Sequence, residues 1–305
     1  MKTAIAAVLL LAAGAASGEP IEAQLSRSKA PRDWALAAEI LLMKAELDQR
    51  DALMKKAVET APDDVLVQWL AALAPVRSGV GDPPAAGLER ARKLATLEPD
   101  NAAHGLQLLA AQNAAGDAKG ADETLAHMAA AKRFDEHYRD YLLAWADAWR
   151  RFPPADAELG TEVMARMAAV PFPAYQAIVK SCDPIDRPAA QAGARWKNCI
   201  AIARRMLDGR TFIARQVGYV VLQRMNELTP EDEAAWLVMR WIMDKGTELT
   251  DAQEMLDPAF GRQWLDDWRD IGREDLIFRR RLEKAKVEAT PPPGWKPPAL
   301  GRQNP

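Results

Sequence analysis

The chain has few of the residues and motifs on which most protein chemistry depends. Its 305 residues include two cysteines and three histidines, and none lies in a CxxC, CxxCH or HExxH spacing. Those spacings are typical of zinc and haem sites, so no metal or cofactor site is predicted. The nucleophile motif GxSxG, the phosphate loop GxxxxGKS/T and a GxGxxG after a strand are also missing. No catalytic residue is therefore predicted.

An excess of charge of one sign is missing too. The formal net charge is −3, with charged residues making up 27% of the chain. A nucleic-acid-binding protein needs a clustered basic face, so this balance excludes nucleic acid as an expected partner. Hydrophobic residues make up 49%, which is enough to bury a sizeable core.

Long apolar runs are scarce, and the one at the N-terminus is short. Residues 1–18 combine Lys2, an apolar run from Ala4 to Ala13 and small residues after it, which is the pattern of a secretory signal peptide. The run is short for a bilayer span of about 20 residues, which argues against an uncleaved anchor. No later segment is predicted to span a membrane. We expect an exported protein, periplasmic in a Gram-negative source, with a short linker over residues 19–30.

The two cysteines, Cys182 and Cys199, leave two interpretations, a disulfide or a pair of buried free thiols. Disulfides persist in oxidising compartments, and an even cysteine count in an exported chain favours pairing. The bond would close a loop of about 18 residues and contribute roughly 3 kcal/mol in the chain-entropy model. The sequence therefore predicts a Cys182–Cys199 disulfide.

The rest of the chain has helical periodicity. Apolar residues recur at three- and four-residue steps, and turns rich in proline, aspartate and glycine separate the runs. The turn Ala61-Pro62-Asp63-Asp64 is repeated as Glu98-Pro99-Asp100-Asn101, and Pro75 is expected to end early the helix that begins near Val65. Self-similarity at a period of 20–50 residues is the mark of a helical repeat array.

Two stretches resemble the tetratricopeptide repeat, a helix–turn–helix unit of 34 residues. The first, residues 31–64, has matching residues at Trp34, Ala38, Leu41, Ala57 and Pro62. The second, residues 102–135, has matching residues at Leu108, Gly116-Asp117, Ala121 and Leu125. The unit between them has a longer loop, and Arg133 replaces the proline that closes a family member. The resemblance implies an all-α, right-handed solenoid of stacked antiparallel hairpins over residues 31–170, with a concave face that binds proteins or peptides.

Residues 171–289 are predicted to form a second, less regular helical region. Thr229-Pro230-Glu231-Asp232 is a strong helix start, since threonine caps, proline suits the first position and acids favour the first turn. Gly246 is expected to end that helix in a left-handed cap. The proline-rich residues 290–305 are expected to be disordered.

Six residues are candidates for contact with a partner. Gly105 stands where the repeat family has a large apolar residue, leaving room for Trp69 or Leu73 of the preceding hairpin or for a bound partner. Two tryptophan pairs, each one helical turn apart, either grip a ligand or form packing stripes. The candidate residues are Gly105, Trp69, Trp145, Trp149, Trp264 and Trp268.

Other polar groups have two interpretations each, one structural and one chemical. His104 and His127 lie on paired helices of one hairpin and are placed to meet, either as structural residues or as metal ligands. Arg279-Arg280-Arg281 either complements a helix C-terminus or binds phosphate. The acids Asp266-Asp267, and Asp183 with Asp186, are interpreted as solvated faces rather than glycosidase carboxylate pairs.

The hypothesis that fits these features is a non-catalytic scaffold in the cell envelope that binds a protein or peptide. One alternative is an all-helical envelope enzyme of a hydrolytic or lytic type with an unrecognised site. Another is a lid or subunit of an envelope assembly.

Overall fold

A computed structural model describes residues 19–77, 85–154, 158–170, 173–183, 192–250 and 252–298. Within these ranges the chain is helical and has no strand, only an isolated bridge between Asn101 and Arg133. The predicted all-α class is confirmed. No helix of the described ranges is long and apolar enough to cross a membrane. The expected signal peptide lies outside the described residues.

The helices follow one another with short connections. In chain order they are α2 (Ile21–Arg27), α3 (Pro31–Met43), α4 (Leu47–Thr60), α5 (Val65–Arg77), α6 (Ala85–Leu97), the 3₁₀ turn η1 (Ala102–His104), α7 (Gly105–Ala115), α8 (Ala118–Ala130), α9 (Tyr138–Arg151), α10 (Leu159–Ala169), α11 (Tyr175–Ser181), α12 (Ala192–Leu207), α13 (Phe212–Met225), α14 (Pro230–Glu248), α15 (Ala252–Met255), α16 (Pro258–Asp270) and α17 (Glu274–Lys284).

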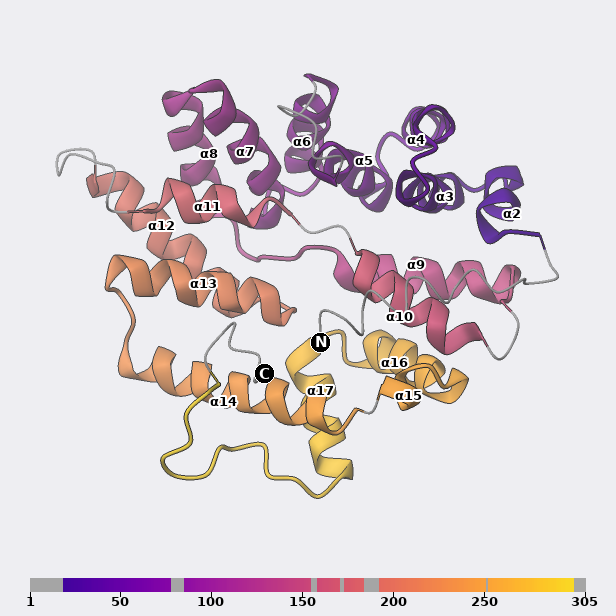
Figure 1. The fold of residues 1–305 in the computed structure, drawn as a ribbon. Helices are drawn as coiled ribbons and strands as arrows, with labels where there is room; N and C mark the ends of the chain where they lie inside the picture. Colours follow the sequence, from indigo (N-terminus) through magenta and orange to yellow (C-terminus); the bar gives the residue numbers. More distant parts are fainter. Residues whose placement is uncertain are drawn as a thin grey trace.

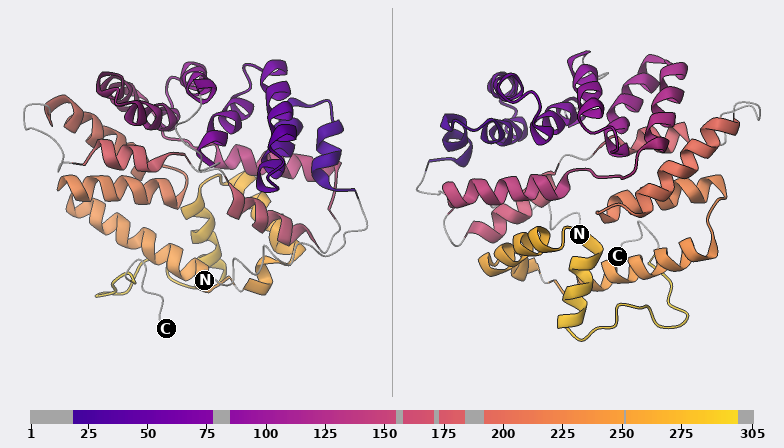
Figure 2. Two further views of the ribbon diagram at one scale, coloured as in Figure 1. Left: turned by 45° about the horizontal axis from the view of Figure 1, so that its top comes forward. Right: turned by 180° about the vertical axis from the view of Figure 1, so that it is seen from behind.

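Consecutive helices pair in the first part of the chain, and the helices as a whole are arranged in three tiers (Figure 1). The pairs α3–α4, α5–α6 and α7–α8 follow one another along an arc that forms the first tier. Helices α9 to α13 form the middle tier, and α14 to α17 form the third. From behind, α8 lies against α12 at one end of the molecule, while α9 and α10 lie at the other end (Figure 2).

Side chains at the turns join successive pairs. Asp63 and Asp64, in the turn before α5, accept from Lys93 at 2.8 Å and from Arg32 at 2.7 Å. Asp100, in the next turn, accepts from Lys132 at 2.9 Å. Asp64 also caps α5, accepting from the backbone N–H groups of Leu66 and Val67 at 3.0 and 3.2 Å. The acidic turns thus start helices and hold neighbouring pairs at the same time.

The largest core joins the beginning and the end of the chain. It includes Trp34 of α3, Trp145 of α9, Trp264 and Trp268 of α16 and Ile277 of α17. Arg151 of α9 adds an ion pair with Asp33, which is buried in α3, at 2.6 Å. The expected division at residue 170 does not separate two cores, because α9 and α10 pack against α16.

A second core lies under α7, α8 and α11 to α13, and a third joins α14 to α17. Part of the expected disordered tail belongs to the third core. The ring of Trp295 packs edge-on against Trp241 at 5.3 Å between centroids, and the Trp241 indole donates to the Glu288 carbonyl at 2.8 Å. Residues 299–305 lie outside the described ranges.

Three local expectations differ from the structure. The expected linker contains helix α2, whose Leu25 is fully buried in the first core. Pro75 does not end its helix early, since α5 continues to Arg77. Gly246 lies inside α14 rather than at its end, and the Phe278 ring occupies the place where a side chain would project. The start of α14 is as predicted, because Thr229 and Asp232 form a reciprocal capping box.

Candidate functional site

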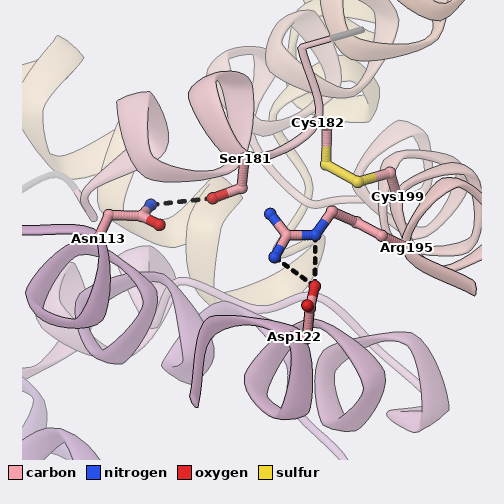
Figure 3. Close-up of a disulfide and its surroundings, with 6 residues drawn as sticks. All are labelled: Asn113, Asp122, Ser181, Cys182, Arg195 and Cys199. Carbon is pink, nitrogen blue, oxygen red and sulfur yellow. Dashed lines mark hydrogen bonds and ion pairs between the residues drawn. A yellow bond between two sulfur atoms is a disulfide. The ribbon is translucent and has the colours of Figure 1, made fainter. Parts of the chain in front are cut away.

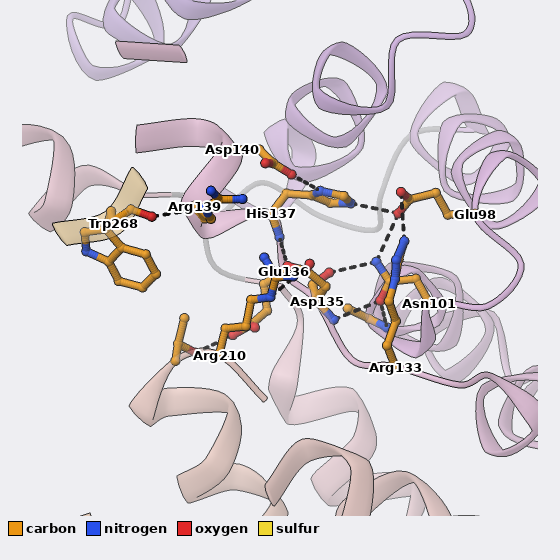
Figure 4. Close-up of polar contacts among 12 residues, drawn as sticks. Glu98, Asn101, Arg133, Asp135, Glu136, His137, Arg139, Asp140, Arg210 and Trp268 are labelled. Carbon is orange, nitrogen blue, oxygen red and sulfur yellow. Dashed lines mark hydrogen bonds and ion pairs between the residues drawn. The ribbon is translucent and has the colours of Figure 1, made fainter. Parts of the chain in front are cut away.

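Glu98, His104 and His137 converge where the turn after α6 meets the segment before α9. Glu98 Oε2 lies 2.8 Å from His104 Nε2 and 3.0 Å from His137 Nε2. The two Nε2 atoms lie 3.5 Å apart, and the imidazole rings stack with an interplanar angle of 10°. Both histidines are buried, and Glu98 is partly buried. Figure 4 shows Glu98 and His137 facing each other across this junction.

Asn101 explains why the two segments meet here. Its Oδ1 accepts from the backbone N–H groups of Ala103 at 3.3 Å and Asp135 at 2.9 Å, and its Nδ2 donates to the Asp135 carbonyl at 2.9 Å. The Ala102 N–H also donates to the Arg133 carbonyl at 2.9 Å. A single asparagine therefore starts η1 and fixes the segment that carries His137.

His137 reaches the cluster through an uncommon backbone conformation. Its φ of 57° and ψ of 19° place it in the left-handed region just before α9, which costs free energy for a residue with a Cβ. The Asp135 carboxylate accepts from the His137 N–H at 3.1 Å and holds this turn. The imidazole is thereby turned toward Glu98.

Two further side chains fix the cluster from outside. Arg133 pairs with Glu98 Oε1 at 2.8 Å, which leaves Oε2 for the histidines. The Asp140 carboxylate lies 2.9 Å from His137 Nδ1. Glu98 is therefore held by Arg133 on one side of the cluster, and His137 is held by Asp140 on the other (Figure 4).

The charges of the cluster are strongly coupled. Burial acts to raise the pKa of Glu98, but hydrogen bonds from His104, His137 and Asn101 outweigh it and hold that pKa far below its usual range. Burial acts to lower the pKa of His137, but hydrogen bonds to Asp140 and Glu98 raise it to about 9. Burial lowers the pKa of His104. The cluster is thus a Glu98–His137 ion pair with a neutral His104 beside it.

The three side chains each offer one ligand atom, and these atoms all lie within 4.8 Å of one another. Two imidazole nitrogens and a carboxylate oxygen are a donor set typical of divalent transition metals. The sequence did not predict this group, and the expected meeting of His104 with His127 does not occur. His127 is exposed on α8. The sequence contains one signal for this group. Asn101 and Asp135 are polar residues in successive turns that precede a helix, so the turns that carry His104 and His137 could have been expected to meet.

A second buried polar group lies next to the cluster. Glu136 accepts from Tyr175 Oη at 2.6 Å and Thr211 Oγ1 at 2.5 Å. Glu274 accepts from the Phe212 N–H at 2.6 Å. Burial raises the pKa of Glu136, and burial together with the Glu136 charge raises that of Glu274 to about 7. These glutamates connect the segment before α9 to α11, α13 and α17.

A cavity of about 340 Å³ lies between α13, α14 and α17. It is lined by Arg215, Ala234, Ala235, Val238, Met239, Ile242, Asp275 and Arg279. Met239 and Ile242 are buried at its floor, whereas Ala234 and Ala235 are exposed at its mouth. Asp275 is held by Arg215 at 2.9 Å and by Arg273 at 3.0 Å. Arg279 forms no ion pair with any residue in the described ranges.

The three consecutive arginines of α17 have three different environments. Arg280 pairs with buried Asp267 at 2.9 Å, and Arg281 stacks on the rings of Phe260 and Trp264 at 4.4 and 4.6 Å. Asp267 is therefore a buried ion-pair residue rather than part of a solvated face. Arg279 alone lines the cavity, so the three do not form one phosphate site.

The disulfide between Cys182 and Cys199 is confirmed, with an S–S distance of 2.06 Å. It joins the end of α11 to α12 within the second core (Figure 3). Two polar contacts to the helix pair α7–α8 flank the disulfide. Asn113 of α7 donates to Ser181 at 2.9 Å, and Arg195 pairs with Asp122 of α8. The bond thus lies where the middle tier packs against α7 and α8.

The acids Asp183 and Asp186 do not form a described pair. Asp183 is bound by Arg224 at 3.1 Å, and Asp186 lies outside the described residues.

The candidate partner-binding residues lie in the protein interior. Exposed fractions of the five tryptophans, Trp69, Trp145, Trp149, Trp264 and Trp268, are between 0% and 4%. The rings of each predicted pair pack together, at 5.6 Å for Trp145–Trp149 and 6.4 Å for Trp264–Trp268. Their positions are those of packing stripes, which was the other interpretation.

Gly105 is buried too, and its space is filled by Met128 of α8. This differs from the expectation that Trp69, Leu73 or a partner fills it. Trp69 and Leu73 instead line a small cavity of about 10 Å³ together with His104 and Gln107. The missing side chain thus permits close packing of α7 on α8.

No protein-family model, no curated protein and no solved structure matches the chain.

Proposed function

We propose that this protein is a non-catalytic scaffold of the cell envelope that binds an apolar peptide segment carrying an anionic group. Its binding site is the cavity between α13, α14 and α17. The single observation that carries this proposal is Arg279, a cation without an ion pair in the described ranges, at the wall of an apolar cavity.

The cavity has the properties of a ligand site. Its volume of about 340 Å³ falls in the range of small-ligand pockets. Apolar side chains form its floor, and the charged side chains come from α13 and α17 at its edge. An apolar side chain of a peptide fits the floor, while a carboxylate of the same peptide pairs with Arg279. Arg215 is already paired with Asp275 at 2.9 Å, so Arg279 is the cation of the cavity lining that is left for an anionic ligand.

The arrangement of the first helices supports a repeat-type scaffold of the kind that the tetratricopeptide resemblance implies. Three helix pairs follow one another, and side chains in their turns join each pair to the next. Asn101 and Asp135, in successive turns, are separated by 34 residues and bonded to each other. That separation equals the length of one tetratricopeptide unit. We infer that the first tier is a short solenoid and the later helices cover one of its faces.

Export agrees with two features of the chain. Residues 1–18 have the composition of a signal peptide, and the Cys182–Cys199 disulfide is suited to an oxidising compartment. We therefore place the scaffold outside the cytoplasm, in the periplasm if the source is Gram-negative.

The glycosidase form of the enzymatic alternative needs two carboxylates that face a substrate. Asp275 is the one carboxylate among the described residues that line the cavity, and Arg215 and Arg273 already bind it. The cavity is therefore better suited to binding than to acid–base catalysis.

A peptide selection tests the proposal. Peptides chosen from a random library with free carboxyl termini should contain apolar residues beside an acid or the terminus. Arg279→Glu should weaken their binding by about 10-fold or more, because a charge-assisted hydrogen bond is lost and repulsion is gained. Arg262→Glu, at an exposed position of α16, is the matched control and should leave affinity unchanged. Equal affinity of wild type and Arg279→Glu contradicts the proposed site.

A further inference from the structure

The junction between the first and middle tiers contains a second site, which does not depend on the cavity. We propose that Glu98, His104 and His137 bind a divalent transition metal ion through Glu98 Oε2 and the two Nε2 atoms.

The spacing of the ligand atoms fits one coordination shell. Metal–nitrogen and metal–oxygen bonds of about 2.0–2.2 Å separate neighbouring ligand atoms by about 2.9 Å in an octahedron and about 3.4 Å in a tetrahedron. The observed separations are 2.8, 3.0 and 3.5 Å. The three separations are therefore close to those of one coordination shell, and an ion there would replace the hydrogen bond that Asn101 Nδ2 donates to Glu98 Oε2 at 3.1 Å.

The surrounding residues are those that a metal site uses. A ligating histidine usually bonds its other ring nitrogen to a carboxylate, which fixes the tautomer and the ring orientation. Asp140 occupies this position on His137 Nδ1, at 2.9 Å. Arg133 holds Glu98 Oε1 at 2.8 Å, so the carboxylate presents one oxygen to the ion.

Space for a water molecule lies beside one of the three ligands, His104. The cavity of about 10 Å³ beside His104 has space for about one water molecule. Gln107, which is 9% exposed, lines the same cavity, and its Nε2 atom has no hydrogen-bond partner among the described residues. A water molecule bound there would satisfy Gln107 on the His104 side of the proposed site.

The donor set selects the class of metal. Two imidazoles and one carboxylate suit zinc, cobalt and nickel ions, whereas magnesium and calcium favour shells made of oxygen atoms. The burial of both histidines and the small size of the adjacent cavity favour an ion that ties the two segments together over one that meets a large substrate.

Zinc titration of the full purified protein, made without a polyhistidine tag and stripped with a chelator, tests the site. We expect one equivalent to bind by calorimetry and native mass spectrometry. The ring ¹⁵N resonances of His104 and His137 should shift on zinc addition, and those of His127 should not. This comparison uses the wild-type protein and does not depend on the folding of a variant.

Variants assign the roles. Glu98→Gln keeps the shape but removes the charged ligand and should abolish binding. Asp140→Asn should weaken zinc binding by about 10- to 100-fold, as expected for a residue that orients a ligand. His127→Gln is the matched control and should bind as wild type does. Failure of zinc to bind, or binding that shifts neither His104 nor His137, overturns the proposal and leaves a hydrogen-bonded cluster only.

Discussion

The Nε2 atoms of His104 and His137 lie 3.5 Å apart in stacked rings, although 33 residues separate the two in the chain. Both face one oxygen of Glu98. His104 directly precedes α7 in the first tier, and His137 directly precedes α9 in the middle tier. The junction between tiers is thus made by three ionisable side chains instead of by apolar packing alone.

Zinc should stabilise the folded protein through this junction. A ligand that binds only the folded state adds about 2.7 kcal/mol to the free energy of unfolding when present at 100 times its Kd. Denaturant unfolding with and without zinc measures the gain. His127→Gln should show the same gain and Glu98→Gln none. An equal gain in both variants would place the ion elsewhere.

Glu274 should make stability depend on pH. Its pKa in the folded protein is raised to about 7 from an ordinary 4.5, by burial and by the charges of Glu136 and Asp275. A raised carboxyl pKa means that the fold favours the protonated form. The contribution of Glu274 to stability is therefore fully present below about pH 4.5 and is lost as the pH rises through about 7, a loss of roughly 3 kcal/mol.

Thermal unfolding between pH 4.5 and pH 8 tests this direction. Glu274→Gln remains neutral and can still accept from the Phe212 N–H, so its stability should fall less over that range than that of wild type. The exposed Glu283→Gln, on the same helix, is the control and should follow wild type. Identical pH profiles for all three proteins would contradict the raised pKa.

The disulfide should stabilise the contact between the middle tier and α7 and α8. Replacing Cys182 and Cys199 together by alanine should lower the free energy of unfolding by about 2–4 kcal/mol. Urea unfolding of the double variant measures the loss, and a reductant should lower wild type to a similar value while leaving the variant unchanged. An equal response of both proteins to reductant would argue against a disulfide effect.

Gly160 should be needed for α10 to pack against α16. A Cβ at this position would lie 2.6 Å from the Asp257 carbonyl oxygen, and the backbone there has little freedom to move. Gly160→Ala should therefore cost about 1–3 kcal/mol, measured by denaturant unfolding. Gly193→Ala, at a helical glycine with nothing within 4 Å of the added Cβ, is the control and should be neutral or slightly stabilising. A neutral Gly160→Ala would show that α10 and α16 are not in close contact.

Signals between residues close in the chain predicted local structure well. Thr229 and Asp232 lie three residues apart at one helix start, each tryptophan pair lies within one helix, and Cys182 and Cys199 lie 17 residues apart, at the end of α11 and in α12. The capping box and the packing stripes follow from short-range geometry, whereas the disulfide follows from the even cysteine count in a chain expected to be exported.

Features that depend on how distant helices meet were not predicted. The sequence predicts a helix end at Gly246. The structure instead places the Phe278 ring of α17 where a side chain at position 246 would project, so only glycine fits there. One hairpin contains both His104 and His127, which predicts that these two meet, yet the bonds of Asn101 to Asp135 bring His137 to His104 instead. The cavity at Arg279 needs three helices from the second half, whose mutual arrangement has no repeat pattern to reveal it.

Photo-crosslinking of a selected peptide tests the proposed binding function most directly. A photoreactive amino acid would replace Ala235, at the mouth of the cavity, and in a second protein Lys55, which is exposed on α4. We expect the peptide to be captured from position 235, to be lost on adding Arg279→Glu, and not to be captured from position 55. Capture from position 55 but not from position 235 would contradict a binding site between α13, α14 and α17.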